Sequence, residues 1–142
     1  MTEAIENMGE IKNALDTLSQ FMPKGERFAL VAGLSTDESE YFAAKILEMA
    51  ERVRTMPATY GQDGKGERAI AYLHYFAGGM DWFITEKDVE PDQLQAFGLA
   101  DLGEGFPELG YISIQELTAH GVELDLHFAP KTLAEIKASR SA

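Results

Sequence analysis

The hydrophobic pattern of this chain changes its period once, at a glycine-rich stretch that covers residues 59–68. Before this stretch, apolar residues recur at spacings of three and four, which indicates amphipathic helices. After it, short runs rich in aromatic and β-branched residues alternate with turn signals, which is typical of strands. Because helices and strands are largely segregated along the chain, the pattern predicts an α+β fold. We expect an antiparallel sheet of four to five strands, with two longer N-terminal helices and two short C-terminal helices packed on one face.

The length of 142 residues predicts a single domain that covers residues 1–142. The hydrophobic fraction of 45% is ordinary for a globular protein and argues against disorder. We expect a helical part at about residues 1–58, a mobile loop at 59–68 and a sheet-forming part at 69–142. Neither half is large enough to bury a good core alone, so we do not interpret the loop as a domain boundary.

Two helices are expected in the N-terminal part. Residues 3–21 carry one apolar stripe of helical spacing. A second helix should begin at Ser35, which has the spacing of a capping box with Glu38, and should close at Pro57. Between them, the apolar run Phe28 to Leu34 is compatible with a strand or with a buried helical turn, because periodicity does not discriminate at this length.

Strands dominate the prediction for the C-terminal part. The expected strands cover residues 69–76, 82–85, 95–102 and 110–112, and the alternating segment 122–128 is typical of a further, half-buried strand. A Gly-Gly pair between the first two strands is a hairpin signal. Capping-box spacing in the pairs Ser113/Glu116 and Thr132/Glu135 predicts the start of two short helices. Gly121 should supply the left-handed residue that ends the first of them.

Residue types that are missing from the chain exclude several classes of protein. The chain has no cysteine, which excludes disulfides and thiolate metal sites and favours a reducing cytoplasm. No run approaches the roughly 20 apolar residues of a membrane helix, and the N-terminal segment lacks the apolar region of a signal peptide. We therefore expect a cytoplasmic protein that does not engage a membrane.

The negative charge of the chain is concentrated in one segment. The formal net charge is −12, and residues 81–125 hold eleven acids but one base, Lys87. Such a surface repels the phosphate backbone, so we expect no direct binding to nucleic acid. It attracts a basic partner and speeds the encounter with it. The charge pattern therefore predicts a basic protein as the partner.

Acidic and aromatic side chains of this segment are the expected binding surface. The expected binding residues are Trp82, Glu86, Asp88, Glu90, Asp101, Glu104, Glu108 and Tyr111. Trp82 is the first choice for an anchor, with a place in the core as the alternative. If the sheet brought the acids near Glu86 together with those near Asp101, they could hold a hard cation or act as acid and base. The simpler interpretation is a solvated acidic rim.

No catalytic arrangement is recognisable in the sequence. The chain lacks a nucleophile elbow, and the glycines at 103 and 105 lack the Lys and Ser/Thr of a phosphate-binding loop. The histidines His74, His120 and His127 do not have the spacing of a helical metal pair, although His74 and His127 could meet across strands. We expect no cofactor, no metal ion and no catalytic residue.

The C-terminal half resembles a known family. The resemblance is carried by WFITEKD at residues 82–88, AFGLADLGEGFPELGYISIQEL at 96–117 and DLHFAPKTL at 125–133. These blocks are similar to the plasmid- and phage-borne family called domain of unknown function 2958. The resemblance implies a bacterial mobile-element context, where accessory proteins often act on host defence systems. It implies no activity and no catalytic residues.

Three functions are compatible with these observations. The first is a mobile-element inhibitor that uses its acids to occupy the basic, nucleic-acid-binding surface of a host protein, such as a restriction or CRISPR component. The second is an accessory domain that forms a homodimer through a sheet edge or through the helix at residues 3–21. The third is a metal-dependent enzyme that uses the loop carboxylates.

Overall fold

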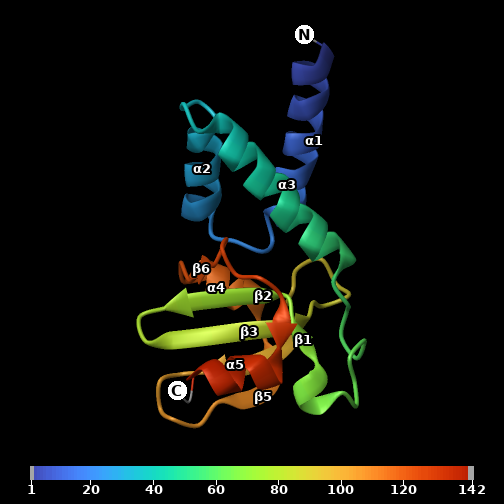
Figure 1. Cartoon of the computed structure of the whole chain (residues 1–142), viewed down its shortest axis with the longest axis vertical. Coiled ribbons are helices and arrows are strands. Elements are labelled where there is room, and N and C mark those ends of the chain that lie inside the picture. Colours follow the sequence, from blue (N-terminus) through green and yellow to red (C-terminus); the bar gives the residue numbers. More distant parts are fainter. Residues whose placement is uncertain (1, 141–142) are drawn as a thin grey trace.

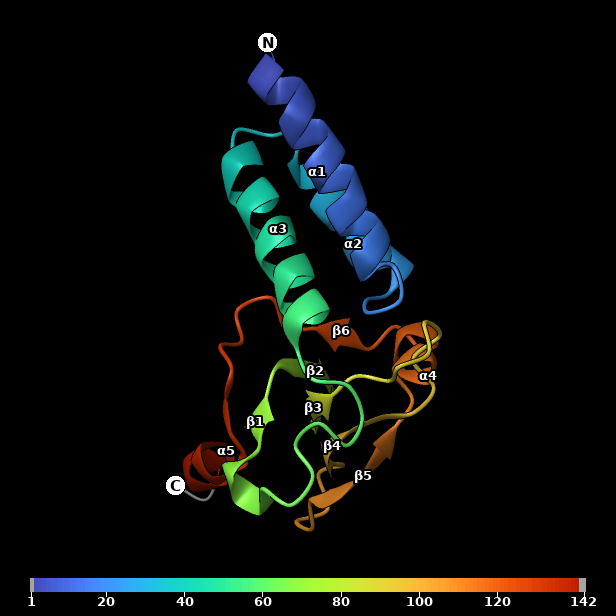
Figure 2. The same ribbon diagram turned by 90° about the vertical axis from the view of Figure 1, so that its right-hand side faces the viewer.

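The computed structural model describes residues 2–140, with side chains described from Met8 onward. Three helices form its N-terminal part, and a sheet flanked by two shorter helices forms the rest (Figure 1). The three N-terminal helices are α1 (Thr2–Leu18), α2 (Lys24–Gly33) and α3 (Ser39–Thr55). Helices α1 and α3 lie side by side above one edge of the sheet, as Figure 2 shows from the side. In the part of the chain that the structure describes, no helix is long and apolar enough to cross a membrane.

The N-terminal part contains one helix more than the sequence predicted. The apolar run Phe28 to Leu34, for which strand and helical turn were both open, lies mostly in α2. Within it, Leu30 and Gly33 are buried, whereas Phe28 is 76% exposed. The run is therefore buried on one narrow side only, and a stripe of two buried positions is too short to show a period. Helix α1 ends at Leu18, three residues before the predicted end.

The predicted capping box at Ser35 and Glu38 is wrong. Helix α3 begins at Ser39, and the Glu38 side chain makes no capping hydrogen bond. Instead, the Thr36 hydroxyl donates to the Gly33 carbonyl oxygen (2.6 Å) and accepts from the Glu38 N–H (3.2 Å). The chain after α2 therefore continues as a hydrogen-bonded turn, which satisfies the groups that the capping box would have used.

Five antiparallel strands form the main sheet, in the order β5-β4-β3-β2-β6. Their bounds are β2 (Leu73–Ala77), β3 (Met80–Glu86), β4 (Ala96–Asp101), β5 (Glu108–Ile112) and β6 (Glu123–Leu124). The predicted hairpin turn joins β2 and β3, where Gly78 adopts a positive φ of 58°. A separate two-stranded sheet pairs β1 (Ile70–Ala71) with β7 (Lys131–Thr132), and η1 (Gly66–Arg68) is a short 3-10 helix. Strand β5 is one edge of the main sheet.

The alternating segment at residues 122–128 forms a strand over two residues only. After β6, the Asp125 N–H still donates to the His74 carbonyl oxygen (2.8 Å). The Asp125 side chain then accepts from the His127 N–H (2.9 Å), which turns the chain away from the sheet. The alternation is therefore real, but an aspartate that bonds to its own backbone two residues on favours a turn over a ladder.

Helices cover both faces of the main sheet. Helix α4 (Ile114–Ala119) lies on one face, which we call the α4 face, and α5 (Leu133–Arg140) lies on the other, the α5 face (Figure 2). Buried residues of α1, α2 and α3 join the α4 face in one continuous hydrophobic cluster. A second, smaller cluster joins α5 to Phe83 and Leu99. The predicted α+β class is confirmed, with two differences: the N-terminal part has three helices in place of two, and α5 does not share a face with the other helices.

Both short helices begin as the sequence predicted. The Ser113 hydroxyl accepts from the Glu116 N–H (3.1 Å) at the start of α4. At the start of α5 the exchange is reciprocal: the Thr132 hydroxyl accepts from the Glu135 N–H (3.1 Å), and the Glu135 carboxylate accepts from the Thr132 N–H (3.2 Å). Gly121 has a φ of 76°, as expected for the residue that ends α4.

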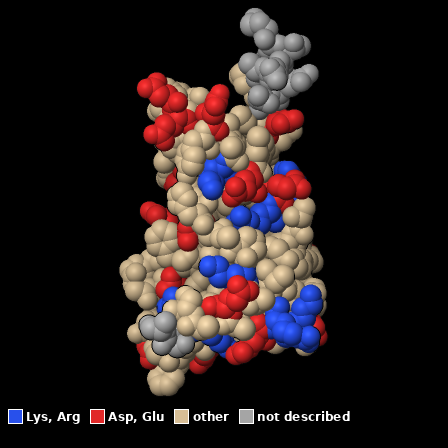
Figure 3. Space-filling view, viewed as in Figure 1, with Lys and Arg blue, Asp and Glu red and all other residues tan. Residues whose placement is uncertain are grey.

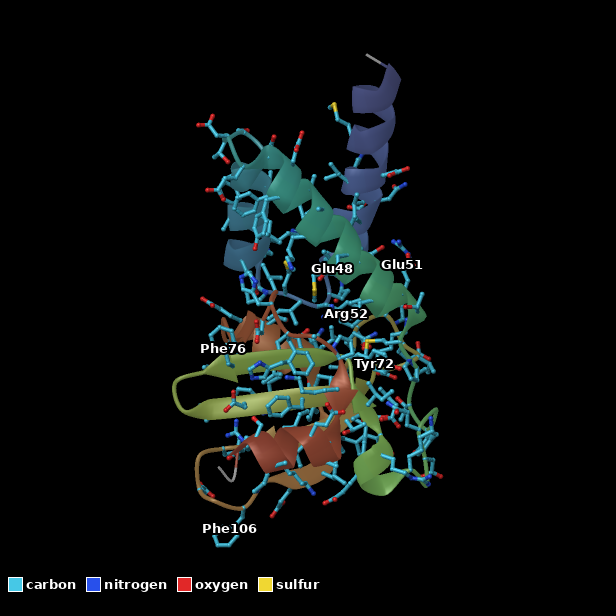
Figure 4. All side chains as sticks on the ribbon, in the orientation of Figure 1. Glu48, Glu51, Arg52, Tyr72, Phe76 and Phe106 are labelled. Atoms are coloured by element: carbon cyan, nitrogen blue, oxygen red, sulfur yellow. The ribbon has the colours of Figure 1, made fainter. Side chains whose placement is uncertain are left out.

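Long-range hydrogen bonds tie the helical part to the sheet-forming part. The Glu26 carboxylate on α2 accepts from the Leu124 N–H on β6 (2.8 Å). On α3, Arg52 donates to the Phe128 carbonyl oxygen (2.6 Å), and Figure 4 shows this arginine pointing toward the sheet-forming part. These contacts and the shared hydrophobic cluster hold α2 and α3 against the sheet.

Candidate functional site

The acidic loops that the sequence singled out lie at opposite ends of the sheet. The loop between β3 and β4, residues 87–95, carries Asp88 and Glu90. The loop between β4 and β5, residues 102–107, carries Glu104 and packs beside the β2–β3 turn. Strand β4 separates the two loops and has six residues, which corresponds to a length of about 20 Å. The sheet therefore separates the two groups of acids that a shared cation site would need.

Several of the predicted binding residues are buried. Asp88 is 8% exposed and holds its own loop together, accepting from the backbone N–H groups of Glu90 (3.2 Å) and Gln95 (3.0 Å). Glu86 is 5% exposed and accepts from the Thr85 hydroxyl. Glu90 itself is exposed. Of these three acids near the end of β3, one is therefore on the surface.

A network of hydrogen bonds on the α5 face contains three more acids. His74 lies between two carboxylates, with its Nε2 2.7 Å from Asp81 Oδ1 and its Nδ1 2.9 Å from Asp125 Oδ2. Arg140 extends the network, with Nη1 3.1 Å from Asp81 Oδ2 and Nε 3.0 Å from Asp101 Oδ2. The Phe83 ring stacks on the His74 ring at 4.6 Å between centroids. Three acids of the segment are therefore satisfied within the molecule.

The network lowers the pKa of two of its carboxyls. A hydrogen bond from the Gly103 N–H, together with Arg140, lowers the pKa of Asp101 below its ordinary value of 3.8. Partial burial alone would raise the pKa of Asp125, but the hydrogen bonds from His74 and from the His127 N–H outweigh it and lower that pKa. Both carboxyls are therefore held in the charged form by their partners.

Three of the remaining acids, Glu104, Glu108 and Glu116, frame a groove on the α4 face, which we call the α4 groove. It has a volume of about 480 Å³. Its apolar floor is formed by Met80, Trp82, Ala100, Leu102, Ile112 and Leu117. Glu116 on α4 lines one side. A smaller pocket that shares Ala100 and Leu102 with the groove carries Glu104 and Glu108, and we call it the extension of the groove. None of the described residues that line the groove or its extension is Lys or Arg.

Exposed apolar side chains surround the extension of the α4 groove. Leu102 is 50% exposed and Phe106 is 80% exposed. Figure 4 shows Phe106 at the tip of the β4–β5 loop, pointing away from the body of the protein. Trp82 lines the groove and also packs, half-buried, against the large hydrophobic cluster. Trp82 therefore contacts the core and also lines the groove, and its role as an anchor for a partner stays a prediction.

Tyr111 lines the edge of the α4 groove, but its ring is turned to the other side of the sheet. Its ring packs edge-on against the Phe97 ring, at 5.8 Å between centroids, and its hydroxyl is 2.6 Å from the Tyr60 hydroxyl. This hydrogen bond raises the pKa of Tyr111. The two tyrosines stand beside a cavity on the α5 face, enclosed between the sheet and residues 59–66, which we call the loop cavity. The loop cavity has a volume of about 220 Å³, and Glu86 lines it.

Charge on the α5 side of the molecule is mixed. On the face shown in Figure 3, where α5 lies in front of the sheet, Lys and Arg side chains lie between the Asp and Glu side chains. A surface that combines acids with exposed apolar groups is found at the α4 groove. In the part of the chain that the structure describes, no group of three His, Asp or Glu side chains is arranged to hold a metal ion.

Comparison with known proteins identifies the family. Residues 43–138 match the family described as "Protein of unknown function (DUF2958)". The chain belongs to this family. The match confirms the resemblance seen in the last 60 residues and extends it to the middle of α3, so the family segment contains the sheet, the α4 groove and the loop cavity. No curated protein and no solved structure matches the chain.

Sequence reasoning missed two features of the site. His74 and Arg140 bind three acids, and counting charges could not reveal this because Arg140 is 39 residues from Asp101. The short separation of His74 and Asp81 across a two-residue turn was a usable signal, since hairpin neighbours meet. The loop cavity was harder to predict from the sequence, because the glycine-rich composition of residues 59–68 indicated a loop but not what the loop covers.

Proposed function

We propose that this protein binds a basic segment of another protein in the α4 groove. The observation that carries the proposal is the combination of an apolar floor with Glu104, Glu108 and Glu116 around it and no Lys or Arg among the described lining residues. Apolar anchors that exclude water, surrounded by a charged rim, are the usual composition of a protein-binding surface. The rim selects a partner of positive charge and raises the rate of encounter.

The chemistry of the groove favours a protein over a nucleic acid. A phosphate backbone would face the three rim carboxylates, and phosphate binding needs Lys and Arg. A segment that carries both Lys or Arg and an apolar side chain would satisfy rim and floor together. Surfaces of that composition occur on proteins that bind nucleic acids.

A host protein that binds nucleic acid is therefore the proposed class of partner. In the mobile-element context that the family resemblance implies, the protein would act in the cytoplasm as an inhibitor of a defence component, such as a restriction or CRISPR protein. It would block the surface with which that component holds its nucleic acid. The support for this step is charge complementarity together with the family context.

The test compares two variants that lose the same charge. The groove variant carries E104Q, E108Q and E116Q, and the control carries D37N, E38Q and E40Q, three exposed acids near the start of α3. Each is incubated with purified nucleic-acid-binding defence proteins of the native host, at low and at high salt. We expect the wild type and the control to bind at low salt, with binding lost at high salt, and the groove variant to bind at least tenfold more weakly.

A second pair of variants separates the apolar floor from overall charge. L102A removes an exposed apolar side chain of the groove, and V31A removes one of similar size on α2. We expect L102A to accelerate dissociation of the complex and V31A to leave it unchanged. The proposal would be refuted if the groove variant and the control bound equally well, or if high salt did not weaken the binding.

A further inference from the structure

The loop cavity on the α5 face contains a buried carboxylate that the protein itself does not neutralise. Glu86 is 5% exposed, and no described Lys, Arg or His forms an ion pair with it. One of its oxygens accepts from the Thr85 hydroxyl. A carboxylate removed from water without a cationic partner is costly, and proteins keep such groups chiefly where a ligand supplies the partner.

The second oxygen of Glu86 is open to the cavity. No described residue donates a hydrogen bond to it, and every fully enclosed side-chain oxygen or nitrogen of the described residues has a partner. This oxygen is therefore reached by solvent, and the space beside it is the loop cavity, which Glu86 lines. A donor that enters the cavity would meet an acceptor that has no competing partner in the protein.

Other polar groups of the cavity are already occupied. The Gln62 amide nitrogen donates to the carbonyl oxygens of Ile70 (2.7 Å) and Thr85 (2.9 Å), and its oxygen accepts from the Ile70 N–H (2.7 Å). Asp63 adds a second carboxylate at the exposed side of the cavity. Glu86 is thus the one buried carboxyl group among the described residues of the lining, and the lining contains no Lys or Arg.

The walls suit the carbon chain of a cation. Phe97, Leu109 and Leu133 supply apolar surface, and Tyr60 supplies an aromatic ring at the mouth. The volume of about 220 Å³ exceeds the cavity of about 150 Å³ that holds benzene in an engineered protein. It is smaller than the roughly 300 Å³ at which sites for drug-sized ligands begin. A group of about six to ten heavy atoms fits between these limits.

We propose that the loop cavity binds the guanidinium or ammonium head of an organic cation, with Glu86 as the partner of the head and the apolar walls around its alkyl chain. The ligand is a free alkyl cation or the side chain of an arginine or lysine from another polypeptide, and the chemistry is the same for both. This site lies on the opposite face from the α4 groove and does not depend on it.

The test uses n-butylguanidinium, with n-pentanol as a neutral compound of similar length. Each is titrated into the isotopically labelled full chain, and backbone amide shifts are followed by nuclear magnetic resonance. We expect saturable shifts at Gln62, Thr85 and Phe97 with the cation, and binding at least about tenfold weaker with the alcohol, because a hydrogen bond to a charged group is the stronger one. This comparison is made on the wild type and so does not depend on a variant that folds.

Variants and a second probe complete the test. E86Q should weaken binding of the cation by about tenfold or more and leave binding of the alcohol unchanged. E90Q, which changes an exposed acid of the β3–β4 loop, should change neither. In a parallel titration, arginine blocked at both ends replaces n-butylguanidinium. Binding of the blocked arginine identifies a polypeptide side chain as a fitting ligand. Binding of n-butylguanidinium without binding of the blocked arginine identifies a small molecule as the ligand. Equal affinity for cation and alcohol, or no saturable shift with any cation, would overturn the proposal.

Discussion

The carboxyl of Glu26 lies where the helical part meets the sheet, and we predict that it makes the protein less stable at alkaline pH. Its oxygen accepts from the Leu124 N–H at 2.8 Å. Burial, together with the nearby carboxylates of Glu123 and Asp125, raises its pKa from 4.5 to about 7 against the opposing effect of that hydrogen bond. The folded protein therefore keeps this proton to a higher pH than the unfolded chain does.

The sign and size of the effect follow from this difference. Between pH 4.5 and about 7 the unfolded chain binds fewer protons at Glu26 than the folded protein, so stability falls as the pH rises through this window. Without screening, the difference between the two pKa values corresponds to a change of about 3 kcal/mol in the free energy of unfolding. Because Glu26 is only partly buried, solvent screening reduces the expected loss to about 1–2 kcal/mol.

The substitution E26Q isolates this contribution. Glutamine keeps an oxygen for the Leu124 N–H but has no proton to lose, so the variant should be more stable than the wild type by about 1–2 kcal/mol near pH 8 and nearly equal to it near pH 5. Urea unfolding of both proteins, followed by the fluorescence of the single tryptophan, measures the difference at each pH. E90Q serves as the control for the loss of one negative charge. A difference between E26Q and wild type that is the same at both pH values would refute the reasoning.

Three further predictions concern stability. A Cβ at Gly98 would lie 2.0 Å from the Phe83 carbonyl oxygen, so G98A should destabilise the protein by about 2–3 kcal/mol in urea unfolding, and an unchanged midpoint would contradict this. The lowered pKa values of Asp101 and Asp125 stabilise the fold above pH 3.8, and this contribution is lost as the pH falls through the folded-state values. D101N should therefore show a shallower loss of stability than the wild type in acid titrations followed by circular dichroism. T132A removes the cap of α5 and should cost about 1 kcal/mol by urea unfolding, with S139A as a control outside the cap.

The sequence predicted those parts of the fold that depend on neighbouring residues. The capping boxes at Ser113 and Thr132 and the Gly-Gly hairpin were correct because each is closed by bonds within a few residues. The same local rule failed at Ser35, where a competing turn through Thr36 used the same backbone groups. Helix α2 was not predicted, because its two buried positions are too few to show a helical period.

The candidate site was harder to predict because its parts come from distant segments. Composition correctly marked residues 81–125 as acidic, but it could not tell that Asp81 and Asp125 are bound by His74, or that Glu86 lies inside a cavity. Alternation along β3 places Trp82 and Phe83 on opposite faces, yet which face forms a groove depends on where α4 docks. That docking is fixed by tertiary packing, which no local pattern encodes.

Strand β5 ends the main sheet, and its outward backbone groups are an open template for strand addition by a second chain. The side chains of Leu109 and Tyr111 on this strand are about half exposed, which makes such pairing more favourable. Glu108, at the start of β5, then acts as a gatekeeper whose charge repels an identical strand. Neutralising Glu108 therefore favours self-association, so light scattering on any variant that carries E108Q distinguishes a lost partner from a newly formed oligomer.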